Sequence, residues 1–158
     1  MDDLITWLRA QLDRDKKAAE EMKKVYPTPW ELADRGWMVR IVADKPHFRE
    51  VVRLEQQHAP DGYGWLSDAV EHVFLQDPDR QLREVEAKRQ LVKRHLPANP
   101  DAEPREGLPG WPDKPWLYCA TCGSGEPNEY PITWPCETLK LVALPFSDRP
   151  GYREDWKP

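Results

Sequence analysis

A proline-rich stretch constrains the fold of this chain most, because it can form neither a helix nor an inner strand. Residues 97–115 contain six prolines and two glycines among charged residues. Proline has no backbone N–H and its ring fixes φ, so it interrupts helices and is kept out of central strands. We therefore expect a long surface loop over residues 97–117, with most of the regular structure before it and a cysteine-containing segment after it.

Two long amphipathic helices are predicted before this loop. Apolar residues recur at helical spacing from Asp2 to about Lys24, and the two prolines of "YPTPW" end that helix. The stretch "DPDRQLREVEAKRQLVKRHL" predicts the second helix, with Asp77 as its cap and Pro78 in its first position. We expect their apolar faces to pack on each other; the faces consist of Leu4, Leu8, Leu12 and Ala19 and of Leu82, Val85 and Val92.

Strand patterns lie between these two helices. "GWMVRIVAD" alternates in the manner of a strand, and "FREVVRLE" is a second β-branched run after the break "KPH". They predict a β-hairpin or a small antiparallel sheet. "WLSDAVEHVFLQ" then predicts a helix capped by Ser67 that meets the next helix at Asp77, and a last short helix is expected from about Pro135 to Leu144.

These elements together predict one small domain of the α+β class over residues 1–158. A chain of this length is sufficient for a single core, and eight tryptophans offset an apolar fraction of only 39%. Residues 1–96 would form a helix, hairpin and helix core, residues 97–117 the loop, and residues 118–158 a metal-binding C-terminal segment.

Three cysteines mark that C-terminal segment as a candidate metal site. Cys119 and Cys122 form a CxxC pair followed by Gly123, which permits the left-handed conformation that such turns often need, and Cys136 follows in the first turn of the last predicted helix. The positive end of that helix would favour the Cys136 thiolate. The pattern resembles a zinc knuckle and predicts a structural zinc ion; a redox pair and plain structural cysteines are the alternatives.

A closed zinc site needs four ligands, so a histidine must complete it. His95 is the first candidate, because it ends the long second helix and the loop after it leads directly to Cys119. His72 is the second candidate, and water is a third possibility. A histidine near a helix C-terminus is also favoured by the helix dipole without any metal, and that alternative stays open for His95.

Several stretches resemble an uncharacterised family found in actinobacteria and their phages, domain of unknown function 6221. They span nearly the whole chain: "MDDLITWLRAQLDRD", "TPW", "DPDRQLREVEAKRQLVKRH" and "PCETLKLVALPFSDRPGYREDWKP". Similar members end the "LREVEAKR" helix in a histidine, matched by His95, and start the last helix with "CPTL", matched at Cys136. A histidine before the central Asp-Pro is matched by His72, whereas Gln76 stands where a second histidine is usual. The resemblance implies no established activity.

The sequence also narrows the classes of function. No run approaches the length of a membrane helix, and "MDDLITWLRA" lacks the basic start and apolar stretch of a signal peptide, so a soluble, cytoplasmic protein is expected. A net charge of −5 argues against a general nucleic-acid binder. We therefore favour a protein-interaction or regulatory module with a structural zinc ion and a protein partner.

Two alternatives to this interaction module remain. The first is a zinc-stabilised nucleic-acid binder, suggested by basic residues of the second long helix, although Glu84 and Glu86 interrupt them; these are Arg83, Lys88, Arg89, Lys93 and Arg94. The second is a metal-dependent enzyme, for which three protein ligands and a water would suffice. It is less favoured, because zinc deaminases require a histidine with glutamate two residues later and a proline before the CxxC pair. No histidine of this chain is followed in that way by glutamate, and Tyr118 precedes Cys119.

Overall fold

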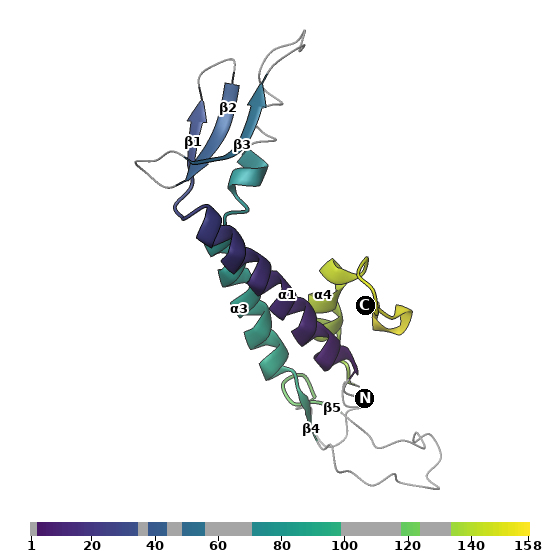
Figure 1. Ribbon diagram of the computed structural model, residues 1–158. Coiled ribbons are helices and arrows are strands. Elements are labelled where there is room, and N and C mark those ends of the chain that lie inside the picture. Colours follow the sequence, from purple (N-terminus) through teal and green to yellow (C-terminus); the bar gives the residue numbers. More distant parts are fainter. Residues whose placement is uncertain (1–2, 35–37, 44–48, 56–70, 99–117, 124–133) are drawn as a thin grey trace, which may run out of the picture. The chain divides into compact units, whose positions relative to one another are not determined.

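The structure is a computed structural model that describes residues 3–34, 38–43, 49–55, 71–98, 118–123 and 134–158 (Figure 1). Its helices and small antiparallel sheets confirm the predicted α+β class. The chain divides into two compact units, one of Met1–Leu12 with Glu86–Pro158 (unit 1) and one of Asp13–Val85 (unit 2). The units are described separately, and the single domain stays a prediction.

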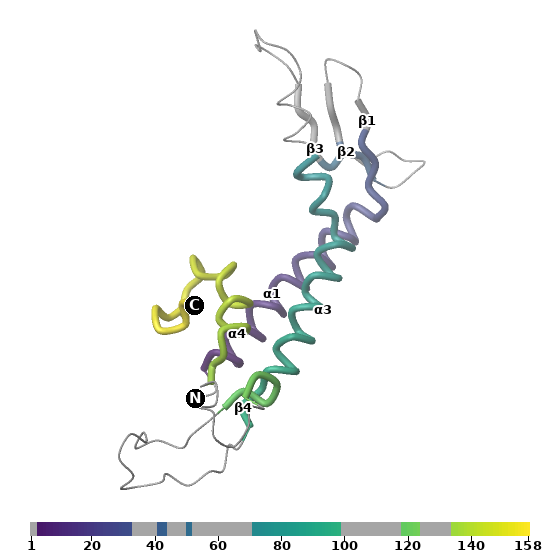
Figure 2. Tube along the Cα trace, turned by 180° about the vertical axis from the view of Figure 1, so that it is seen from behind, coloured from purple at the N-terminus to yellow at the C-terminus, as the bar shows by residue number. Residues whose placement is uncertain are grey.

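Two long helices, α1 (Asp3–Val25) and α3 (Pro78–Arg94), contribute residues to both units. Within each unit, part of α1 lies beside part of α3 (Figures 1 and 2). The predicted apolar faces are buried, because Leu4, Leu8, Leu12 and Ala19 on α1 and Val85 and Val92 on α3 have little exposed surface. Leu82 is only partly buried. The helical periodicity of the sequence thus identified the core positions of both helices.

The start of α3 also follows the prediction. Asp77 caps it, because its Oδ1 accepts the backbone N–H groups of Asp79 at 2.8 Å and Arg80 at 3.0 Å. Pro78 takes the first helical position, where a backbone N–H would have no hydrogen-bond partner within the helix, so its absence costs nothing. The side chain of Pro78 is fully buried. The helix expected before Asp77 is present at residues 71–74, while Ser67, its expected cap, lies outside the described residues.

Unit 2 contains a three-stranded antiparallel sheet in the order β1-β2-β3. Its strands are β1 (Glu31–Asp34), β2 (Met38–Ala43) and β3 (Arg49–Glu55), so the predicted hairpin of β2 and β3 is confirmed and β1 was not predicted. Buried Trp30, Ile41 and Ala43 form a core cluster with partly buried apolar neighbours; these are Tyr26, Val51, Val73 and Phe74.

Unit 1 contains the rest of the regular structure. Two short strands, β4 (Pro97–Ala98) and β5 (Tyr118–Cys119), pair antiparallel. They are followed by α4 (Glu137–Ala143) and the 3-10 turns η1 (Leu144–Phe146) and η2 (Glu154–Trp156). The predicted last helix is therefore confirmed. Pro97 and Ala98 show that the proline-rich stretch starts with a short edge strand, a position in which proline is tolerated.

An aromatic cluster joins the start of α1 to the C-terminal residues of unit 1. The ring centroid of Trp7 lies 6.4 Å from that of Phe146, 5.7 Å from that of Tyr152 and 5.3 Å from that of Trp156. Trp7 Nε1 also donates to the carbonyl of Pro150 at 3.0 Å. Gly151 has φ of 86°, and a Cβ there would lie 3.0 Å from Trp7 Nε1, so only glycine fits this turn.

Candidate metal centre

His95 lies directly after α3 and continues its hydrogen-bonding pattern. Its backbone N–H donates to the carbonyl of Leu91 at 3.1 Å, and its side chain is 8% exposed. The chain then enters β4, so the imidazole stands at the junction of helix and strand. The helix therefore fixes the position of the histidine before any ion is considered.

Pairing of β4 with β5 brings the CxxC pair to this junction. Pro97 lies opposite Cys119, and the N–H of Ala120 donates to the carbonyl of Leu96 at 3.0 Å. The cysteine turn closes on itself, because the N–H of Cys122 points at Cys119 Sγ, 3.4 Å away. The pairing of β4 with β5 thus brings Cys119 close to His95, although the two residues are 24 positions apart in the chain.

Gly123 has a different role from the predicted one. Its φ is not in the left-handed region, which among the described glycines only Gly151 adopts. Its N–H instead donates to the carbonyl of Cys119 at 2.8 Å. A Cβ at Gly123 would lie 2.7 Å from Tyr118 Cδ2 and 2.8 Å from the Cys119 carbonyl oxygen. The turn therefore needs glycine for space and not for a positive φ.

Cys136 reaches the same place from the start of α4. It is the N-cap residue, directly before the first turn in which it was predicted, and its carbonyl accepts the N–H of Lys140 at 3.2 Å. Its side chain is 1% exposed. Nearby, Trp134 Nε1 donates to the carbonyl of His95 at 3.2 Å, which ties the approach to α4 to the end of α3.

The four side chains converge on one point. His95 Nδ1 lies 3.3 Å from Cys119 Sγ, 3.3 Å from Cys122 Sγ and 3.5 Å from Cys136 Sγ. All four ligand atoms lie within 4.8 Å of one another. A tetrahedral ion with Zn–S of about 2.3 Å and Zn–N of about 2.0 Å would give S···N distances of about 3.5 Å. The arrangement therefore has the dimensions of a four-ligand metal site.

Hydrogen bonding alone does not account for this convergence. One imidazole nitrogen offers a single site, either one N–H or one lone pair, and three sulfur atoms lie within 3.5 Å of it. Two of the three contacts would therefore be left without a hydrogen bond. A cation between the four atoms satisfies all of them, so the cluster can bind a metal ion.

The electrostatics of the thiols also favour a cation. Burial raises the pKa of Cys136 to about 11, and the charges of Cys119 and Cys122 add to this effect. The N–H of Leu139, in the first turn of α4, lowers the pKa of Cys136, in the direction predicted for the helix N-terminus, but burial outweighs it. Three thiolates this close need a compensating positive charge, and a divalent ion would supply it.

Cys119 differs from Cys136 in this respect. Burial alone would raise the pKa of Cys119, but hydrogen bonds from the N–H groups of Cys122 and Thr121, together with the thiols of Cys136 and Cys122, lower it below its usual value. The CxxC turn therefore stabilises the thiolate of its own first cysteine through the backbone, as metal-binding turns do.

His72, the second predicted candidate, is not part of this cluster. It is exposed and belongs to unit 2, so the structure favours His95 as the fourth member. His47 and His58 lie outside the described residues. All four residues predicted to bind metal, His95, Cys119, Cys122 and Cys136, do lie together; that they coordinate an ion is a prediction.

Sequence reasoning missed two side chains that support the cluster. Thr121 Oγ1 donates to the carbonyl of Arg94, and Trp134 Nε1 donates to the carbonyl of His95. Both bonds hold the end of α3 against the cysteine segments. The Trp-Pro-Cys order at Cys136 and the threonine inside the CxxC pair are present in the sequence, but neither residue type by itself signals such a role.

The comparisons with known proteins identify a family but no function. Among the described residues, no helix has the length and apolar character to cross a lipid bilayer. No curated protein matches the chain, and no solved structure does. A family of unknown function, DUF6221, matches residues 1–158. The chain therefore belongs to the DUF6221 family.

Proposed function

We propose that His95, Cys119, Cys122 and Cys136 bind one zinc ion. The observation that carries this proposal is the convergence of three sulfur atoms on a single imidazole nitrogen at 3.3–3.5 Å. Thiolates and imidazole are the ligands that zinc takes in tetrahedral protein sites. Carboxylates, which magnesium and calcium prefer, are not part of the described cluster.

The zinc ion has a structural role in this proposal. Four protein ligands fill a tetrahedral shell, whereas catalytic zinc sites keep one position open for water. Cys119 and Cys136 are buried, and His95 nearly so. The ion would join the end of α3, the strand β5 and the start of α4, all in unit 1. In this proposal the ion stabilises the contacts between these elements, which in a less polar chain would depend on a larger apolar core.

The process in which the protein acts is proposed to be a protein–protein interaction. The net charge of −5 favours a protein partner over a nucleic acid, and a structural ion leaves the site without a chemical step. The contacts of the basic helix residues point the same way: Lys88 Nζ lies 5.5 Å from the ring centroid of Phe146, so part of this charge is directed at the protein itself. A soluble, cytoplasmic protein is part of the same proposal.

Metal content tests the zinc site. Full-length protein purified without added metal should contain about one zinc ion per chain by elemental analysis, as expected for a closed four-ligand site. His95→Ala should bind zinc less tightly, because a water must then replace the imidazole. His72→Ala is the matched control, since His72 is exposed and outside the cluster. Equal zinc affinity for His95→Ala and wild type would remove the histidine from the site.

The interaction is tested in cells. Crosslinking and capture of the tagged protein from an actinobacterial host, the source that the family resemblance suggests, should recover a defined protein partner, identified by mass spectrometry. A gel shift with duplex DNA at low salt should show no retardation. Retardation that falls steeply with added salt would instead support the nucleic-acid alternative, because phosphate contacts release counterions.

A further inference from the structure

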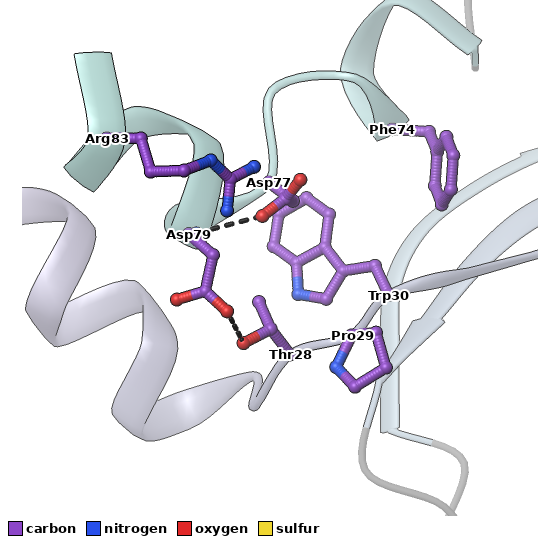
Figure 3. A pocket seen from close by; sticks show the side chains of 7 residues that line it. All are labelled: Thr28, Pro29, Trp30, Phe74, Asp77, Asp79 and Arg83. Carbon is purple, nitrogen blue, oxygen red and sulfur yellow. Dashed lines mark hydrogen bonds between the residues drawn. The ribbon is translucent and has the colours of Figure 1, made fainter.

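A cavity of about 290 Å³ lies in unit 2, and none of its lining residues belongs to the metal cluster (Figure 3). Three parts of the chain line it: the segment after α1, the turn before α3 and the first turns of α3. Cavities that bind small molecules are mostly about 300–1,000 Å³. This cavity is at the lower end of that range, so it suits one side chain or a group of similar size.

One wall of the cavity is apolar and fixed in place. Pro29, Trp30 and Phe74 form it. Trp30 is 7% exposed, packs with the sheet and donates its Nε1–H to the carbonyl of Tyr26 at 3.1 Å. The indole is therefore held before a ligand arrives, and a preformed wall reduces the entropy lost on binding.

The two carboxylates of the cavity already have partners. Asp77 accepts two N–H groups at the start of α3. Asp79 accepts the Thr28 hydroxyl, and Lys23 Nζ lies 2.5 Å from its other oxygen. The hydrogen bond from Lys23, followed by that from Thr28, lowers the pKa of Asp79, so this carboxylate is charged and compensated. Neither group requires a cation from a ligand.

Arg83 is the charge in the cavity without such a partner. Its side chain is exposed, and the structure gives it no hydrogen bond or ion pair to any described residue. Figure 3 shows its guanidinium pointing toward Asp77. Its charge contributes to the lowered pKa of Asp79 without forming a direct bond. The cavity thus combines an apolar wall with one available guanidinium.

We propose that this cavity binds a peptide segment of a partner protein in which an apolar side chain stands next to a carboxylate. The apolar side chain would lie against Trp30 and Phe74, and the carboxylate would pair with Arg83, a geometry for which guanidinium is suited. A phosphate suits the cavity less, because its second charge would face Asp77 and Asp79. The inference rests on the proposed interaction with a protein and names the chemistry of that partner.

Three blocked dipeptides test the proposal: N-acetyl-Phe-Glu-amide, N-acetyl-Phe-Gln-amide and N-acetyl-Ala-Glu-amide. In a titration of ¹⁵N-labelled full-length protein, the first should shift the amide signals of Trp30, Asp79 and Arg83 with a dissociation constant of about 1 mM, as expected for so small a ligand. Loss of the carboxylate should weaken binding about fivefold, because the ion pair is exposed. Loss of the phenyl ring should weaken it at least about tenfold.

Arg83→Gln separates the two contacts. This variant should bind the Phe-Glu and Phe-Gln peptides equally, yet still prefer phenylalanine to alanine. Arg83→Lys should recover part of the preference for glutamate, and Arg14→Gln, another exposed arginine of unit 2, should behave as wild type. An unchanged amide spectrum outside the cavity shows that each variant is folded.

Three results would overturn the inference. The first is the absence of shifts at Trp30 with saturating Phe-Glu peptide, and the second is a glutamate preference that survives Arg83→Gln. Inorganic phosphate that shifts the Arg83 signal more strongly than the peptide would also contradict it and favour a nucleic acid. If a protein partner is captured from cells while the dipeptides do not bind, this cavity is wrong and the proposed function stands. Failure to capture any partner contradicts the proposed function itself.

Discussion

Cys119→Ser should release the metal ion and open the β4–β5 pair together with the start of α4. The serine hydroxyl is a poor zinc ligand at neutral pH, and the Cys119 side chain has no exposed surface, so solvent cannot replace it without disturbing the turn. Structural zinc ions contribute about 10–16 kcal/mol of apparent binding free energy in zinc-finger peptides. Losing that contribution should exceed the effect of any single apolar substitution in unit 1.

Amide hydrogen exchange measures this effect at defined positions. The N–H groups of Ala120, Gly123 and Lys140 are hydrogen-bonded within or beside the cluster. Their exchange should become about 100-fold faster or more in Cys119→Ser and in wild type treated with a chelator, because the local opening free energy falls. The amides of β2 in unit 2 are the internal reference and should change much less. Unchanged exchange at these three amides after metal removal would show that no ion stabilises the segment.

Leu8→Ala should lower the free energy of unfolding by about 2–5 kcal/mol, the range observed for buried leucines. Leu8 has no exposed surface and lies in the middle of the apolar face of α1. Removing its branched end leaves a cavity that its helical neighbours can fill only in part. Chemical denaturation, followed by tryptophan fluorescence and circular dichroism, gives this difference.

Leu141→Ala is the matched control for this substitution. Leu141 is also a helical leucine of unit 1, but its side chain is 51% exposed. The same chemical change there should cost well under 1 kcal/mol, as is usual for surface sites. If both variants unfold at the same denaturant concentration, the face formed by Leu4, Leu8 and Leu12 is not the core of this unit.

The helices could be predicted because their signals are local. The spacing of Leu4, Leu8 and Leu12 defines one face of α1 without reference to the rest of the chain, and Asp77 with Pro78 marks the start of α3 by cap chemistry alone. The strand β1 was missed for the opposite reason. "ELAD" has no alternation of apolar residues, and Leu32 is exposed, so only its pairing with β2 makes it a strand.

The members of the metal cluster could also be predicted, but not its construction. The CxxC spacing predicted a zinc site, and because the chain has only three cysteines, a histidine was needed as the fourth ligand, with His95 as the first candidate. The pairing of β4 with β5, the bond from Trp134 to the His95 carbonyl and the crowding around Gly123 depend on contacts between distant segments. Burial likewise outweighs the effect of the helix N-terminus on the pKa of Cys136, and the extent of burial cannot be inferred from the position of a residue in a helix.

The cavity of unit 2 lay beyond sequence reasoning for the same reason. Thr28 and Asp79 are 51 residues apart, and nothing in either local pattern predicts their hydrogen bond. Arg83 was predicted as one of several basic residues on a solvated helix. It becomes distinctive only when the partners of Asp77 and Asp79 are known, since these leave its charge available.

Zinc K-edge X-ray absorption on the full-length protein, purified without added metal, tests the zinc site most directly. The proposed ligands require three sulfur atoms at about 2.3 Å and one nitrogen at about 2.0–2.1 Å. The spectrum of His95→Ala should lose the imidazole scattering and keep the three sulfur atoms. A wild-type spectrum with fewer than three sulfur atoms, or one that His95→Ala leaves unchanged, would contradict the assignment of this cluster as the zinc site.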